Sequence, residues 1–378
     1  MKVPFANLQR DEKETQIEGE NIEERIKRNI LDVIKRKNFI LGDYVERFEK
    51  AFADYCGVKH FIGIANGLSA LELSLIGLNI WAGDEVITVA NTFNATVAAI
   101  VKIGVAPVLV DASEEDFNLE FHQVLNSLTN KTKAIIPVHL YGQTASMDNF
   151  LRLAQQYRIP IIEDVCQAHG SYLNGKRAGS FGAAGCFSFY PGKNLGCYGD
   201  GGAIVTNDGE LANFLKATRN YGQTKKYFHD IRPDNSRLDT IQAAVLIEKL
   251  RVLDSWNTMR ADNAQIYRKL LQDVPEIQLP KERKRGEHIY HLFVVRAERR
   301  DELVEFLKEK EIDLGLHYPV PIHLQGCFSF LNYRRGDFPV SERLSEEILT
   351  LPMFPTIRPE EIGYVTKSIK EFYSRKAS

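Results

Sequence analysis

Short apolar runs alternate with stretches of helical periodicity over most of the first 250 residues of the chain. From residue 60 onward, the apolar runs have the length and composition of buried strands. The expected strands cover residues 60–65, 85–90, 107–110, 133–138, 160–163, 186–190 and 203–206, with helices at 68–78, 95–103 and 149–157. Continuously apolar strands are typical of a parallel sheet that is covered on both faces. The pattern therefore predicts an α/β unit with a large, mostly parallel sheet.

The chain has a different character at its two ends. Residues 1–17 look like an irregular arm, and amphipathic helices are expected at 18–36 and from Asp43, the expected N-cap, to residue 55. After a short helix and a polar loop at 207–235, a long helical stretch with a break is expected from 238 to 271. The remaining expected elements are a half-exposed strand at 288–297, a helix at 300–308, a strand at 313–318, and helices at 341–349 and 359–373. We expect a large α/β domain with an N-terminal arm at 1–250 and a smaller α+β domain at 251–378.

Composition narrows the class of protein. The 378 residues are 44% hydrophobic and 26% charged, with a formal net charge of −2, so no nucleic-acid surface is indicated. Neither a signal-peptide core nor a run of about 18 apolar residues is present, so we expect no membrane span. The five cysteines are scattered without a CxxC pair, which suits reduced thiols and a cytoplasmic location.

A lysine lies in a turn between two apolar strands. Lys193 follows Pro191 and Gly192, which end the expected strand 186–190. Burial disfavours the ammonium form, so a lysine held there tends to become a neutral nucleophile. The main chemistry that needs such an amine is Schiff-base formation with a carbonyl, including the aldehyde of pyridoxal phosphate. A surface lysine is the alternative, but Ser188 and the nearby glycines, which suit a phosphate, favour the cofactor.

A second constellation follows the expected strand 160–163, which ends in Glu163 and Asp164. Ligand-contacting groups of α/β folds lie at the carboxyl ends of parallel strands. An aspartate there can pair with a protonated pyridine nitrogen, which makes pyridoxal phosphate an electron sink. The alternative is a helix N-cap, which is weaker once Lys193 is considered with Asp164.

Two further turns carry candidate ligands. Gly67 and Ser69 lie where a strand turns into a helix, and the first backbone N–H groups of a helix bind phosphate. A simple strand-to-helix turn is the alternative there. Phe93 follows the strand 85–90, where its ring can stack on a flat ligand or fill the core instead.

His317, Tyr318 and His323 cluster in a proline-rich loop. The histidines are six positions apart and lack a third ligand at standard spacing, so a polar substrate lip is favoured over a metal site. The glycines at 199–202 lack the GxGxxG pattern of a Rossmann reductase, which argues against that class of enzyme.

Four motifs in order carry a specific resemblance: EDVCQAHG at 163–170, SFYPGKN at 188–194, NSRLDTIQAA at 235–244 and GLHYPVPIHLQ at 315–325. In these segments the chain resembles the DegT/StrS family of pyridoxal-phosphate-dependent sugar aminotransferases. The resemblance implies a type I (aspartate aminotransferase-like) fold and a homodimer whose active sites are shared between subunits. It also implies that the cofactor alternates between pyridoxal phosphate and pyridoxamine phosphate.

The same resemblance implies roles for individual residues. Lys193 matches the lysine that bonds to the cofactor and moves the proton, and Asp164 matches the partner of the pyridine nitrogen. Leu68 stands where the family often has threonine, so the backbone N–H groups of Leu68 and Ser69 would replace a lost phosphate ligand. The other matched positions are a residue near the 3-hydroxyl group (Gln167), a phosphate ligand (Ser188), a phosphate ligand from the other subunit (Asn235), the ring-stacking aromatic (Phe93) and the site wall (His169).

Similarity within the family favours enzymes that aminate C3 of a dTDP-linked 3-keto-6-deoxyhexose with L-glutamate as donor, releasing 2-oxoglutarate. The product would be a dTDP-3-amino-3,6-dideoxyhexose for surface polysaccharide such as lipopolysaccharide. Sugar contacts are expected from His169, Tyr221, His317, Tyr318 and His323. The alternatives are a C4 aminotransferase acting on a 4-keto sugar nucleotide and a non-catalytic PLP-binding regulator.

Overall fold

The computed structural model describes residues 1–282 and 288–375. Its N-terminal segment is more ordered than the sequence suggests, because residues 8–14 form helix α1 (Leu8–Glu14), capped by the Asn7 side chain. The expectation of an irregular arm is wrong for these residues. A short hairpin of β1 (Gln16–Ile17) and β2 (Glu20–Asn21) leads into the long helices α2 (Ile22–Arg36) and α3 (Asp43–Cys56). Asp43 is the first residue of α3, and Gly42 is its N-cap.

Seven strands form the central sheet. Parallel pairing joins β5 (Ala106–Val110), β4 (Glu85–Val89) and β6 (Thr132–Ile136). Bridges at Ile135–Ile161 and Val138–Asp164 continue the parallel pairing from β6 to β7 (Ile162–Asp164), which pairs with β10 (Ala184–Ser188). Only β11 (Gly202–Thr206) is antiparallel to its neighbours, β10 and β3 (His60–Ile64). The predicted, mostly parallel sheet is therefore confirmed.

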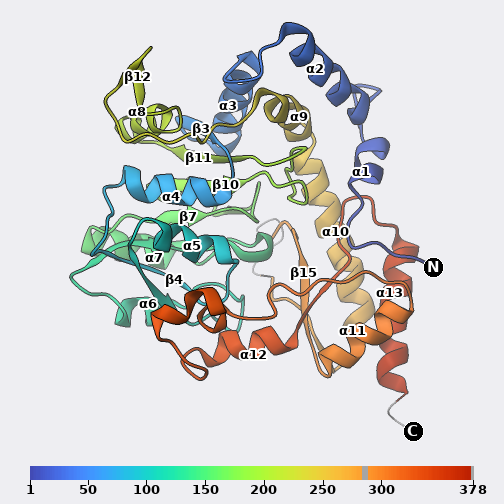
Figure 1. The fold of residues 1–378 in the computed structure, drawn as a ribbon. Coiled ribbons are helices and arrows are strands. Elements are labelled where there is room, and N and C mark those ends of the chain that lie inside the picture. Colours follow the sequence, from blue (N-terminus) through green and yellow to red (C-terminus); the bar gives the residue numbers. More distant parts are fainter. Residues whose placement is uncertain (283–287, 376–378) are drawn as a thin grey trace.

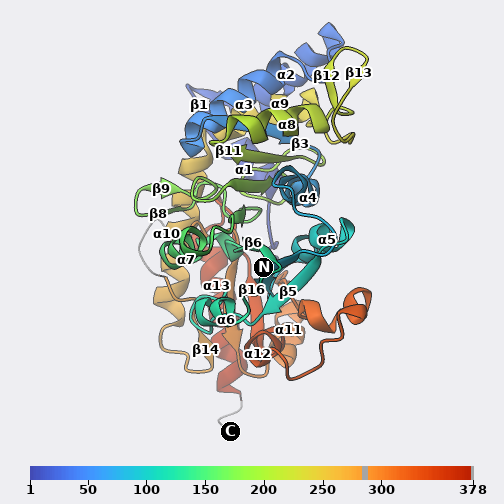
Figure 2. The same cartoon turned by 90° about the vertical axis from the view of Figure 1, so that its left-hand side faces the viewer.

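Helices cover both faces of this sheet, as the continuous apolar strands predict (Figure 1). Alternating residues of one strand face opposite ways: Phe187 packs with α3 and α9 (Thr240–Leu250), whereas Cys186 packs with α4 (Gly67–Gly77), α5 (Asn94–Lys102) and α8 (Gly209–Thr218). The other helices on this part of the chain are α6 (Phe121–Asn126) and α7 (Met147–Tyr157). Two small hairpins complete it: β8 (Tyr172–Leu173) with β9 (Lys176–Arg177), and β12 (Gln223–Lys225) with β13 (Phe228–His229), which lies near α8 in Figure 2.

The long helix α10 (Leu253–Leu271) leads from α9 to the C-terminal elements, after the predicted break (Figure 1). These elements are the antiparallel strands β14 (Ile277–Gln278), β15 (Phe293–Ala297) and β16 (Ile348–Leu351), with helices α11 (Arg300–Glu309), α12 (Pro339–Glu347) and α13 (Pro359–Ser374). Buried side chains of α10, of the three strands, of α11 and α13, and of Val3 form one core, whereas Leu344 of α12 and Val294 of β15 pack into a core under the large sheet. The domain boundary at residue 250 stays a prediction, and part of the second domain (283–287 and 376–378) lies outside the described residues.

Three expectations in this part are wrong. Strand β15 is buried rather than half-exposed, because it is the middle strand and its faces contact two different cores, Phe293 in one and Val294 in the other. Residues 313–318 form no strand, since only Gly315 pairs with β16. The helix expected over 341–349 ends at Glu347, and residues from Ile348 onward pair with β15 instead. Within the described residues, no helix is long and apolar enough to span a bilayer.

Candidate active site

Lys193 lies in a tight turn between β10 and β11. Its backbone N–H donates to the Tyr190 carbonyl over 2.9 Å. A Cβ at Gly196 would lie 2.3 Å from the Pro191 carbonyl oxygen, so the turn closes only with glycine there. Burial lowers the pKa of Lys193 from its usual 10.5, while the nearby Cys166 and Asp164 act in the opposite direction. The turn thus holds a lysine whose amine is more readily neutral than a surface lysine's.

Asp164 ends β7 and is 5% exposed. Its backbone is fixed to the neighbouring chain, since its N–H donates to the Pro137 carbonyl (3.0 Å) and its carbonyl accepts from His139 (2.9 Å). Its side chain accepts two hydrogen bonds, from the Cys166 N–H to Oδ1 (3.2 Å) and from the Thr96 hydroxyl to Oδ2 (2.8 Å). The carboxylate is therefore oriented, and its charge reaches Lys193.

The β3–α4 turn lies against the end of β10. A Cβ at Gly67 would meet the Cys166 Sγ at 2.7 Å and the Ser188 Cβ at 2.8 Å, so the expected phosphate ligands Gly67 and Ser188 are adjacent. The Ser69 backbone N–H donates to the Asn66 side chain over 2.9 Å. The Ser69 N–H is therefore engaged by the N-cap of α4, and the predicted phosphate contact of Ser69 stays a prediction.

Gln167, in the segment that follows β7, connects this segment to the proline-rich loop of residues 315–325. Its Nε2 donates to the Tyr318 hydroxyl (2.9 Å), and its Oε1 accepts from the Tyr141 N–H (2.8 Å). The Tyr318 ring lies 5.5 Å from the ring of Phe93, which is 54% exposed. Three predicted site residues from distant parts of the sequence thus come together, and the exposed Phe93 ring is accessible to a flat ligand.

Two predicted histidines lie close to this cluster, and both are neutral at pH 7. His317 contacts Phe5 and hydrogen-bonds the Thr350 hydroxyl through Nδ1 (2.8 Å). Burial, assisted by the charge of Lys193, lowers its pKa to about 4. His169 is buried against Phe187 and Phe189, and the same two causes lower its pKa to about 3.

Three predicted residues lie elsewhere. The His323 side chain is 0% exposed and bonds to Glu342 (2.8 Å), so it supports the loop from inside and does not fit the expected sugar contact. Tyr221 and Asn235 are exposed in the segment between α8 and α9, where Asn235 pairs with Asn220. The role of Asn235 in the other subunit stays a prediction.

Several residues of this site were not predicted from the sequence. Thr96 and Cys166 contact Asp164, and Tyr141 contacts both Gln167 and the His317 carbonyl. His291 lies behind the lysine turn, with Nδ1 3.1 Å from the Asn194 side chain, and burial lowers its pKa well below its usual value. Four of these residues lie inside short motifs of the sequence: Cys166 and Asn194 in motifs noted above, Thr96 in NTFNAT at 91–96 and Tyr141 in HLYGQ at 139–143.

These residues fit pyridoxal phosphate. A lysine with a lowered pKa, an oriented carboxylate, an exposed aromatic ring and a glycine turn packed against a serine come from four separate segments. Lys193 would bond to the aldehyde, and Asp164 would pair with the ring nitrogen.

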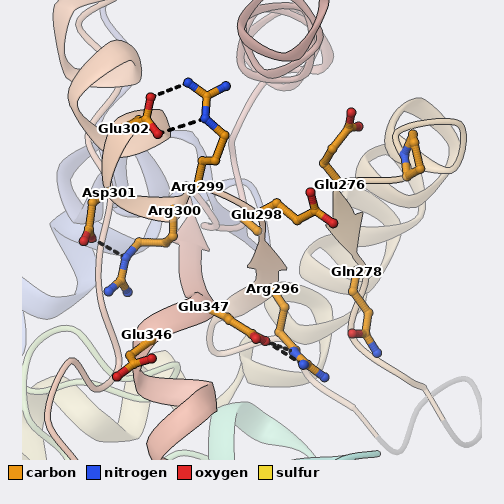
Figure 3. A pocket seen from close by; sticks show the side chains of 12 residues that line it. Glu276, Gln278, Arg296, Glu298, Arg299, Arg300, Asp301, Glu302, Glu346 and Glu347 are labelled. Carbon is orange, nitrogen blue, oxygen red and sulfur yellow. Dashed lines mark hydrogen bonds and ion pairs between the residues drawn. The ribbon is translucent and has the colours of Figure 1, made fainter. Parts of the chain in front are cut away.

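A surface pocket of about 700 Å³ lies between β14, β15, α11 and α12 (Figure 3). Neither Lys193 nor Asp164 lines it. Its arginines pair with acidic neighbours, as Arg296 does with Glu347 at 2.6 Å. The pocket therefore lacks the chemistry of the Lys193 cluster.

The chain resembles known proteins over nearly its whole length. Residues 20–370 match the model of the DegT/DnrJ/EryC1/StrS aminotransferase family. The chain is 43% identical to a "Pleiotropic regulatory protein" of Geobacillus stearothermophilus, covering 99% of both. It is 42% identical to the dTDP-3-amino-3,6-dideoxy-alpha-D-galactopyranose transaminase of Aneurinibacillus thermoaerophilus, covering 88% of this chain and 91% of the relative.

Among solved structures, DesV of S. venezuelae in complex with a ketimine intermediate superposes with a TM-score of 0.94 at 40% identity, covering 98% of both chains. The predicted type I fold is confirmed by this similarity. The chain therefore belongs to the DegT/DnrJ/EryC1/StrS aminotransferase family and is a pyridoxal-phosphate-dependent sugar-nucleotide aminotransferase.

Proposed function

We propose that the enzyme transfers the amino group of L-glutamate to C3 of a dTDP-linked 3-keto-6-deoxyhexose. The product is a dTDP-3-amino-3,6-dideoxyhexose, a precursor of surface polysaccharide. The observation that carries the choice of C3 is the 42% identity to the A. thermoaerophilus enzyme, whose name describes a dTDP-3-amino-3,6-dideoxyhexose transaminase. We also propose a cytoplasmic location, where nucleotide sugars are made.

We assign the following roles within this proposal. Bound pyridoxal phosphate supplies two groups: a carbonyl group, which carries the amino group from one substrate to the other, and a ring, which accepts electrons. Lys193 is the base that takes the proton from the donor carbon and returns a proton to the acceptor carbon; its lowered pKa suits this role. Asp164 keeps a proton on the ring nitrogen. Gly67, Leu68 and Ser188 hold the phosphate, and Phe93 and Gln167 hold the ring.

We propose fewer sugar contacts within one subunit than the five residues expected from the sequence. Tyr318 and His317 border the cluster beside Phe93, and His169 supports it from the buried side. Tyr221 and Asn235 are exposed and serve, in our proposal, the site of the second subunit of a homodimer. Asn235 would reach the phosphate there.

The test begins with the absorbance spectrum of the purified protein. A band near ~410–430 nm that moves to ~330 nm on adding L-glutamate establishes glutamate as donor. Offering 3-keto and 4-keto dTDP-hexoses to the aminated enzyme, with NMR of the product, then decides the position. Amination only at C4 would overturn the C3 proposal. A bound cofactor without turnover would favour a regulatory role instead, as the name of the G. stearothermophilus relative suggests.

Two variants test the assigned roles. Lys193→Ala should abolish turnover without changing the circular dichroism spectrum, whereas Lys308→Ala, which removes an exposed lysine, should change neither. Asp164→Asn should retain the cofactor but reduce turnover by orders of magnitude. Turnover near wild type in either site variant would remove that residue from its role.

A further inference from the structure

Two buried threonines lie in series behind Asp164. The Thr96 hydroxyl donates to Asp164 Oδ2 over 2.8 Å, and Thr92 Oγ1 lies 2.9 Å from Thr96 Oγ1. The exposed fractions of Thr92, Thr96 and Asp164 are 3%, 1% and 5%, so water does not compete for these bonds. A hydroxyl has one proton, and Thr96 uses it on Asp164, so Thr92 must donate to Thr96. The result is a directed chain of donors that ends on the carboxylate.

The Thr96 hydroxyl bonds to Asp164 Oδ2, whereas the Cys166 N–H bonds to the other carboxylate oxygen, Oδ1. Hydrogen bonds to an ionised acceptor are stronger than neutral ones, and a second donor in line polarises the first. Thr96 therefore stabilises the negative charge of Asp164 and fixes the plane of its carboxylate.

Thr88 is a buried threonine of the same sheet domain whose hydroxyl has only a structural partner, and it serves as a comparison for Thr96. It is also fully buried, in β4, which β6 separates from the strand of Asp164, and its hydroxyl donates to the Ile136 backbone carbonyl over 2.9 Å. That bond ties β4 to β6 and touches no charged group. Thr96, in contrast, directs its only proton at the side chain of a site residue.

We propose that Thr96, supported by Thr92, is a positioning residue for the transamination. By orienting Asp164 and stabilising its charge, it enables Asp164 to keep a proton on the ring nitrogen of the cofactor. The proposal rests on the role assigned above to Asp164. Thr96 touches no reacting atom and acts entirely through the carboxylate.

The test uses the cofactor-loaded enzyme and the visible absorbance band of the bound cofactor, titrated with pH. If the ring nitrogen loses its proton more readily, the ring withdraws fewer electrons from the Lys193 nitrogen that is bonded to it through the cofactor carbonyl carbon. That nitrogen then keeps its own proton to a higher pH. Thr96→Val should therefore raise the pH at the midpoint of this titration. It should also reduce the rate of the glutamate half-reaction roughly 10-fold or more. Thr96→Ser, which keeps the hydroxyl, should restore both, and Thr92→Val should give a smaller shift in the same direction.

Controls separate this effect from loss of packing. Thr88→Val removes an equally buried hydroxyl and should leave the midpoint at its wild-type value even where the melting temperature falls. Asp164→Asn should shift the midpoint upward by more than Thr96→Val does. An unchanged midpoint in Thr96→Val beside a shifted one in Asp164→Asn would overturn the proposal alone. Unchanged midpoints in both variants would overturn the role of Asp164 as well. If Thr96→Val does not fold, Thr92→Val decides: a shift supports the proposal and no shift overturns it.

Discussion

Gly67 is the position where one added methyl group should separate cofactor binding from folding. A Cβ there would lie 2.7 Å from the Cys166 Sγ and 2.8 Å from the Ser188 Cβ, well inside ordinary contact distance. Gly67→Ala therefore displaces Cys166, Ser188 or the start of α4, and the last two form the sides of the proposed phosphate site. Overpacking of this kind typically costs ~1–3 kcal/mol. Where the cofactor-bound state carries that cost, the dissociation constant of pyridoxal phosphate rises roughly 5- to 140-fold, at ~1.4 kcal/mol per factor of ten.

The assay is a titration of cofactor-free enzyme with pyridoxal phosphate, followed by absorbance. Gly363→Ala is the matched control, because its Cβ would meet no atom within 4 Å and it lies in α13. That variant should bind the cofactor as the wild type does and be up to ~1 kcal/mol more stable, since alanine favours a helix. Adding Cys166→Ala to Gly67→Ala removes one of the two close contacts and should recover part of the affinity. An unchanged dissociation constant in Gly67→Ala, with a lowered melting temperature, would refute the assignment of this turn to the phosphate.

Three further predictions concern pH and stability. Burial lowers the pKa of Lys193 below 10.5, so the rate of cofactor uptake by the cofactor-free enzyme should rise with pH and reach half its maximum below pH 10.5; a midpoint at or above that value would contradict the burial argument. Burial also lowers the pKa of His317 to about 4, so His317→Gln should leave the shape of the kcat/KM profile between about pH 5.5 and 8 unchanged, and loss of an inflection near pH 6.5 would show that His317 titrates there. Glu163→Ala removes the acceptor for His139 Nε2 and for three backbone N–H groups, so it should destabilise the fold by roughly 3 kcal/mol or more, measured by urea denaturation. The exposed ion pair between Arg335 and Glu346 provides the control. Arg335→Ala should lower the free energy of unfolding by less than ~1 kcal/mol, and an equal loss of stability in both variants would contradict the burial argument for Glu163.

Much of the fold was predictable from local pattern. The strands of the central sheet pack on both faces, as Cys186 and Phe187 show, and a strand of that kind is apolar at every position. Pattern failed where an element's surroundings differ from its local composition. Helix α1 is rich in charged residues and read as an arm, yet Asp11 and Glu12 are buried, where Asp11 bonds to Thr356 and Glu12 pairs with Lys249 at 2.6 Å. A charge pattern does not show which partners will neutralise it.

The candidate site shows the same division. Lys193, Asp164 and Ser188 lie in or beside recognisable motifs at strand ends, and the structure brings them to one place. His323 belongs to an equally recognisable motif but is turned inward to Glu342. Tyr318 and His323 lie in the same loop, yet Tyr318 borders the site and His323 supports the loop from inside. The sequence pattern of the loop does not show which of its side chains face the site.

The sequence by itself determined the α/β class, the lysine and the carboxylate that suit pyridoxal phosphate, and the family. Those properties depend on residue type, strand pattern and short motifs, which are local. Only the tertiary structure decided which side chains orient these groups. Thr96 meets Asp164 across 68 positions of sequence, and Gln167 meets Tyr318 across 151. Such contacts exist because packing the helices on the sheet brings distant segments together, and no feature of either segment alone contains that information.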